Sequence, residues 1–115
     1  MRYERRERPQ HKAGYHPPQD IWFDPEAFDL LPAEVQQELL DWIHQHFTSG
    51  KRGGSRIFNR TTYAFKARFL FDTGIYLSDG AMKGAMLRAG YEPINRSAQS
   101  WEFRARFNWT DRIAL

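Results

Sequence analysis

The sequence predicts an α+β fold in which three helices form the core and a β-hairpin follows them. Apolar residues recur at three- and four-residue steps in 32–47, Gly74 and Gly90 stand where helices are expected to end, and 101–107 alternates between apolar and charged residues. The chain has 115 residues, of which 16% are aromatic. This is enough for one domain with an aromatic core.

Local start signals divide the first half of the chain. Asp24 followed by Pro25 is typical of a helix start and predicts a short turn over residues 25–29. Pro32 begins a longer helix over 32–47, whose apolar residues share one face. We expect the polar, glycine-rich residues 48–55 to form a loop after it.

Two further helices and a short strand are expected next. Thr61 or Thr62 caps a helix over 61–72, which is apolar on more than one side and is therefore expected to be central. Residues 75–77 form a brief strand, and a serine and an aspartate then cap a helix over 79–89. The segment 1–19 has no periodicity and is expected to be a flexible basic arm before a single domain over 20–115.

Two runs with the pattern of short strands, 91–94 and 101–107, flank a polar turn at 95–100, and this predicts the hairpin. Alternation places the apolar side chains of the second run on one face, and Glu102, Arg104 and Arg106 on the other. The side chains that we expect to be mostly buried are Trp42, Phe69, Leu70, Met82, Met86, Trp101 and Phe103.

The helix over 79–89 has an unusual composition. Its expected inner stripe is Met82, Ala85, Met86 and Ala89, and its expected outward positions are Gly80, Lys83, Gly84, Leu87 and Arg88. Each glycine weakens a helix by about 1 kcal/mol relative to alanine, so two in one short helix suggest that another backbone approaches closely. Nucleic acid, a protein partner or a neighbouring part of this chain would each explain them.

The order helix, helix, short strand, helix, hairpin is that of a winged helix-turn-helix. Residues 63–93, YAFKARFLFDTGIYLSDGAMKGAMLRAGYEP, add a resemblance that covers about a quarter of the chain and rests on pattern. From Tyr76 to Pro93 the chain resembles the third-helix region of small winged-helix-like proteins of bacterial phages and integrative mobile elements. The resemblance implies DNA binding as a common use, and protein docking as another.

Charge is divided into blocks. The net charge of +3 comes from +3 in residues 1–19, −7 in 20–50, +6 in 51–71 and +1 in 72–115. A basic face of this kind attracts polyanions. The alternative is that the acidic region faces the basic block within the protein.

The first functional hypothesis is a non-catalytic, regulatory nucleic-acid-binding protein, with DNA favoured over RNA. Basic residues lie in the glycine-rich loop, the third helix and the expected wing, where they can contact phosphates or base edges. The arm can dock in the same way, and solvated surface charges are the alternative. The candidate contacts are Lys51, Arg52, Arg56, Arg60, Lys66, Lys83, Arg88, Arg104 and Arg106.

The second hypothesis uses the acidic stretch. Acids alternate there with aromatic residues, as expected of a phage-encoded inhibitor of the anti-CRISPR type that occupies the nucleic-acid site of a bacterial defence nuclease complex. The candidate contacts are Asp20, Trp22, Asp24 and Glu26. The alternative is that the aromatic residues belong to the core and the acids only solvate them.

Other classes have little support in the sequence. There is no cysteine, so disulfides and thiolate zinc sites are excluded. His44 and His46 are two residues apart on a helix, a spacing that prevents chelation of one metal, and the glycines match no phosphate-loop pattern. No apolar run is long enough to span a bilayer. We therefore expect a cytoplasmic protein with no catalytic site, metal or cofactor.

Overall fold

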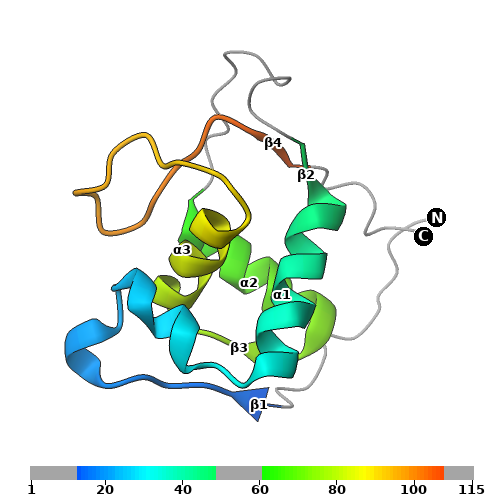
Figure 1. Ribbon diagram of the computed structural model, residues 1–115, viewed down its shortest axis with the longest axis vertical. Coiled ribbons are helices and arrows are strands. Elements are labelled where there is room, and N and C mark those ends of the chain that lie inside the picture. Colours follow the sequence, from blue (N-terminus) through cyan, green and yellow to red (C-terminus); the bar gives the residue numbers. More distant parts are fainter. Residues whose placement is uncertain (1–12, 49–60, 108–115) are drawn as a thin grey trace.

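Figure 1 shows a computed structural model, which describes residues 13–48 and 61–107. It has the mixed helix and strand content expected of an α+β chain. The helices are the 3-10 helices η1 (Gln19–Ile21) and η2 (Pro25–Leu30), and the α-helices α1 (Ala33–His46), α2 (Thr62–Thr73) and α3 (Asp79–Arg88). The strands are β1 (Ala13–Gly14), β2 (Phe47–Thr48), β3 (Ile75–Tyr76) and β4 (Arg106–Phe107).

The predicted helix ends are confirmed to within one or two residues, because local side chains and backbone set them. The Asp24 carboxylate accepts a hydrogen bond from the Glu26 amide at 2.9 Å and starts η2. The Ser78 hydroxyl oxygen accepts one from the Ala81 amide at 3.1 Å and starts α3. Gly74 ends α2 with a φ of 81°, a left-handed conformation that favours glycine.

The start of the described chain is part of the domain. Strand β1 pairs in parallel with β3, with Ala13 opposite Ile75 and Gly14 opposite Tyr76, and the Tyr15 amide donates to the Tyr76 carbonyl at 3.0 Å. The prediction that the flexible arm extends to residue 19 is therefore wrong for residues 13–19. Residues 1–12 lie outside the described part.

The predicted hairpin is not formed as a two-stranded ladder. Its two halves share an isolated antiparallel bridge between Pro93 and Phe103, and β4 pairs instead with β2. The physical reason is competition for backbone groups: the Trp101 carbonyl and amide bond to the Thr62 amide and hydroxyl at 3.0 Å each. Proline, which has no amide hydrogen, also limits the ladder. The alternation is confirmed, since Trp101, Phe103 and Ala105 are buried and Arg104 is exposed.

Helix α3 lies at the centre of the fold, in contact with η2, α1 and α2 (Figure 1). Residues 79–86 are all buried, so the prediction of an outward face over Gly80, Lys83 and Gly84 is wrong. Its inner stripe is confirmed at Met82, Ala85 and Met86. The other residues expected in the core are buried too, except for Leu70, which is half-buried.

The two glycines of α3 allow the chain of residues 22–28 to lie directly on the helix. A Cβ on Gly80 would stand 2.7 Å from the Asp24 nitrogen and closer still to the Asp24 carbonyl oxygen. A Cβ on Gly84 would stand 2.5 Å from the Phe28 Cβ and closer to the Pro25 carbonyl oxygen. The close approach inferred from the sequence is therefore to another part of this chain.

This contact predicts the effect of Gly84→Ala. Although alanine gains about 1 kcal/mol in helix propensity, overpacking against a backbone should lower the free energy of unfolding by about 1–3 kcal/mol. Chemical denaturation measures the change. The comparison variant is Gly90→Asn, which adds backbone strain at a φ of 99° without overpacking, because a Cβ there meets no atom within 4 Å. A Gly84→Ala protein as stable as the wild type would contradict the packing.

Candidate functional site

The structure divides the nine basic candidates into three groups. Lys51, Arg52, Arg56 and Arg60 lie outside the described residues. Lys66 and Lys83 are buried. The exposed members are Arg88 and Arg104, and the side chain of Arg106 lies outside the described part.

Lys83 has a structural position. Its side chain is only 4% exposed, and its ammonium group donates to the Phe23 carbonyl at 2.9 Å. The same group lies 4.9 Å from the centre of the Trp101 ring. Burial lowers the pKa of Lys83, whereas the charges of Asp79 and Asp24 raise it. Lys83 therefore fastens residue 23 to α3, and its expected role in contacting nucleic acid does not fit its burial.

Lys66 is also withdrawn from the surface, at 8% exposure. Its ammonium group lies 4.6 Å from the ring centre of Tyr76 and 5.1 Å from that of Tyr63. Arg88 is exposed, but it pairs with Asp29 of η2 at 3.3 Å and lies among acidic residues. These positions make Lys66, Lys83 and Arg88 weaker candidates for phosphate contacts than the sequence predicts.

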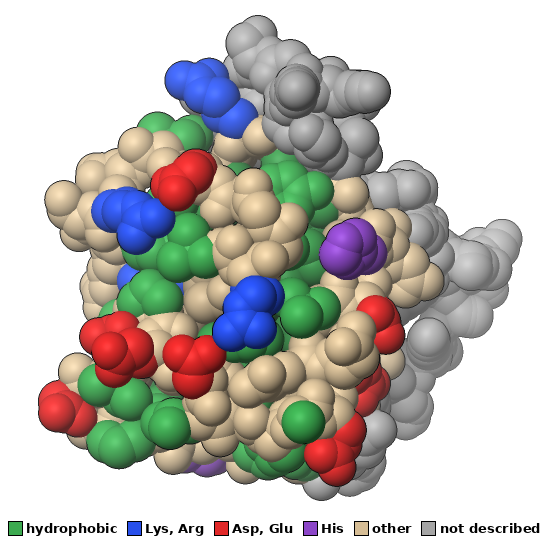
Figure 2. Space-filling view, in the orientation of Figure 1, with side chains coloured by type: hydrophobic (Ala, Val, Ile, Leu, Met, Phe, Trp, Pro, Cys, Tyr) green, Lys and Arg blue, Asp and Glu red, His purple; other side chains and the backbone are tan. Residues whose placement is uncertain are grey.

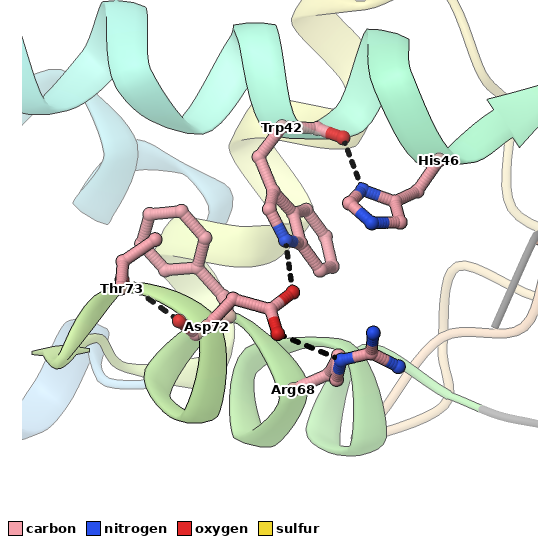
Figure 3. A network of polar contacts seen from close by, with 6 residues as sticks. Trp42, His46, Arg68, Asp72 and Thr73 are labelled. Atoms are coloured by element: carbon pink, nitrogen blue, oxygen red, sulfur yellow. Dashed lines mark hydrogen bonds and ion pairs between the residues drawn. The ribbon is translucent and has the colours of Figure 1, made fainter. Parts of the chain in front are cut away.

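Arg68, another base of the +6 block, belongs to a polar network between α1 and α2 (Figure 3). The Trp42 indole nitrogen donates to one oxygen of Asp72 at 2.8 Å, and Arg68 Nε donates to the other at 3.0 Å. His46 Nδ1 lies 3.0 Å from the Trp42 carbonyl oxygen. The Arg68–Asp72 pair lies within α2 and orients the carboxylate, whose hydrogen bond from Trp42 links α2 to α1.

A second buried network surrounds Asp79, which is 1% exposed. One carboxylate oxygen accepts from the Thr62 hydroxyl at 3.0 Å and from the Ser100 hydroxyl at 3.1 Å. The other oxygen is buried and has no hydrogen-bond partner within the described residues. Burial raises the pKa of Asp79, while the two hydroxyls and then Lys83 and Lys66 oppose that shift. This network joins the starts of α2 and α3 to residues 100–101.

Sequence analysis missed the interior position of Asp79. An acidic residue in the first turn of a helix is usually a solvated partner of the helix dipole, and the sequence predicts for Asp79 only a place in the helix cap. The contacts of Asp79 come from Thr62 and Ser100, which are distant in the chain. Gly80 and Gly84, which indicate the close approach of another backbone, are the local signal that this helix is buried.

The four acidic-stretch candidates also separate. Asp20 and Glu26 are exposed. Asp24 is half-buried at the start of η2, and Trp22 is half-buried with its ring 6.2 Å from that of Tyr76. Figure 2 shows acidic side chains gathered over the lower half of this face, where η2 and the start of α1 lie. This face is therefore acidic as the sequence predicts, but two of its four expected contacts serve the fold.

One exposed base, Arg104, lies close to where β2 pairs with β4. In this antiparallel β2–β4 ribbon, Phe47 is opposite Phe107 and Thr48 is opposite Arg106. Arg104 is exposed just before the ribbon. Lys51 and Arg52 follow Thr48 closely in the sequence, so the pairing joins the chain leading into the basic loop to the arginine-bearing strand.

The Asp79 network predicts a pH effect. Burial raises the pKa of this carboxyl group above its ordinary value of 3.8. As pH rises from 3.8 through the raised pKa, ionisation of the carboxyl group therefore destabilises the folded state. Asp79→Asn removes the ionisation and keeps an acceptor for Thr62 or Ser100. The free energy of unfolding of the variant relative to the wild type should therefore increase from acidic to neutral pH.

Denaturation at a series of pH values measures that difference, with Glu34→Gln on the exposed face of α1 as the control. A difference for Asp79→Asn that is constant across the series would refute the assignment.

No family model, curated protein or solved structure gives a significant match to this chain. The resemblance to winged-helix-like proteins of phages and mobile elements stays a prediction from the sequence.

Proposed function

We propose that the chain is a non-catalytic nucleic-acid-binding protein, and that the contacts come from the segment 49–60 and the β2–β4 ribbon. The observation that carries this proposal is the pairing of Thr48 with Arg106. Three extended residues span at most about 10 Å, so the chain from Thr48 to Lys51 is short. The proposal therefore groups Arg106 with Lys51 and the bases that follow it, although these residues are far apart in the sequence.

The distribution of charge supports the same end. Among the side chains that the structure describes, eleven acids stand against six bases. Segment 49–60 has four bases and no acid, and residues 1–12 have five bases and two acids. The acidic face over η2 and α1 repels a polyanion, and the ribbon with its adjoining segment attracts it. Phosphate neutralisation then supplies most of the affinity.

In this proposal the domain is a modified winged helix of phage or mobile-element type with a regulatory role, and DNA is favoured over RNA. The order of the three helices supports the comparison. Residues 91–105 follow α3, as the wing would. The domain differs from a winged helix in α3, the third helix, which is buried. The contacts with nucleic acid are therefore assigned to the basic segments and not to this helix.

The first test neutralises the basic segment. Changing Lys51, Arg52 and Arg56 together to glutamine should weaken binding and reduce the slope of log affinity against log salt by about 2–3. The reason is that each phosphate no longer contacted by the protein keeps its bound counterion. Fluorescence anisotropy of a labelled oligonucleotide over a series of salt concentrations measures both quantities. A wild-type protein that binds no oligonucleotide at low salt would overturn the proposal.

A matched pair of variants tests the location. Arg104→Gln with Arg106→Gln should lower affinity more than Arg88→Gln with Arg96→Gln, although each pair removes two cations. Arg88 and Arg96 are exposed and paired with Asp29 and Glu92, at 3.3 and 3.1 Å. Equal losses from the two pairs would show that net charge, and not the ribbon, determines binding.

A second candidate, an inhibitor that occupies a basic nucleic-acid channel of another protein, is favoured by one observation. A shallow groove of about 460 Å³ lies between η2 and the end of α3, lined in part by Glu26, Asp29 and Leu87. If a pull-down recovers a protein that resists nuclease treatment and is lost on Asp20→Asn with Glu26→Gln, this candidate replaces the first.

A further inference from the structure

A row of aromatic rings joins three separate elements on one side of the domain. His16 follows β1, and its ring is stacked on that of Tyr76 in β3, with centroids 5.2 Å apart and planes at 25°. Trp22, at the end of η1, lies 5.9 Å from His16 and 6.2 Å from Tyr76. The parallel pairing of β1 with β3 brings these rings together. We call His16, Trp22, Tyr76, Lys66 and Tyr63 the aromatic row.

Lys66 extends this row to α2. Its ammonium group is near the ring centres of both Tyr76 and Tyr63, at 4.6 and 5.1 Å. A cation between two rings is attracted by both, most strongly when it is shielded from water, and Lys66 is 8% exposed. The lysine therefore contacts both tyrosines and favours their positions beside it.

The two ends of the row are exposed, while its interior is packed. Tyr63 is 62% exposed and His16 is exposed as well. Tyr76, which contacts His16 and Lys66, is half-buried, and so is Trp22, which packs beside His16 and Tyr76. Attachment of β1 to the domain explains the packing of His16, Trp22 and Tyr76. It does not explain why a tyrosine in the first turn of α2 presents most of its surface to water beside a buried cation.

An exposed aromatic ring, held in place beside a positively charged chain, is the usual platform for an unpaired base. Proteins that bind single strands combine basic grooves with rings on which bases stack, and stacking needs the flat face of a base that a duplex does not expose. Tyr63 comes three residues after Arg60, the last base of the 49–60 segment. A base that can attract phosphate and a ring that can stack on a nucleobase are thus close together in the sequence.

We propose that Tyr63 and His16, the exposed ends of the aromatic row, stack on unpaired bases, so that the preferred ligand is a single-stranded nucleic acid or a single-stranded region of one. This inference rests on the nucleic-acid binding proposed above. It adds the ligand class, and it assigns Lys66 and Tyr76 the role of positioning the rings. The buried lysine then supports binding without touching a phosphate.

The test compares a labelled single strand with the duplex of the same sequence, using the full chain and fluorescence anisotropy. Tyr63→Ala should weaken single-strand binding by about 5- to 150-fold, the range for loss of one stacked base. Duplex affinity and the salt dependence should stay unchanged. Tyr63→Phe keeps the ring and should bind the single strand nearly as well as the wild type. Quenching of 2-aminopurine in the strand reports the stacking itself.

Leu30→Ala is the matched control, because Leu30 is 60% exposed and lies outside the row. Circular dichroism shows whether each variant is folded, and His16→Ala gives a second measurement at the other end of the row. Equal losses for single strand and duplex, or no loss in Tyr63→Ala, would overturn the stacking inference while leaving nucleic-acid binding intact. A wild-type protein that binds neither ligand would instead remove the proposed function.

Discussion

The contact between α3 and the backbone of residues 22–25 determines much of this structure. Gly80 and Gly84 have no Cβ, so the chain entering η2 lies directly on the helix. The Gly80 amide donates to the Trp22 carbonyl at 2.9 Å, and Lys83 donates to the next carbonyl, that of Phe23. Because this segment covers α3 from one side while α1 and α2 pack on others, the helix is enclosed. A helix in this position supports the fold and is not an exposed recognition element.

Enclosure of α3 changes how the charge of the protein is used. Lys66, Arg68 and Lys83 are buried in contacts with rings, a carboxylate or a carbonyl group. The described surface is left mainly acidic over η2 and α1 (Figure 2). In the function proposed above, attraction for a polyanion comes from the basic segments 1–12 and 49–60 and from the ribbon. The fold supplies the anchoring of those segments, and the row from His16 to Tyr63 adds aromatic surface.

Sequence reasoning succeeded where local interactions decide the outcome and failed where distant groups compete. Prolines, capping side chains and glycines predicted most of the helix ends, and alternation predicted the buried face of residues 101–105. The predicted hairpin is reduced to one antiparallel bridge, because Trp101 forms backbone hydrogen bonds with Thr62 and β4 pairs with β2. Neither interaction is visible in the spacing of residues 91–107. Burial of Lys83 depends on a carbonyl 60 positions away in the chain. The aromatic row depends in the same way on the pairing of β1 with β3.

The most direct test of this account is a map of backbone amide chemical shifts on titration with a single-stranded oligonucleotide, together with amide hydrogen exchange. A buried α3 predicts slow exchange and small shift changes for residues 81–86. The largest changes should fall in 49–66, in 104–107 and at His16. Shift changes concentrated on α3, with its amides exchanging quickly in the free protein, would show that the helix is an exposed recognition element and would contradict the account.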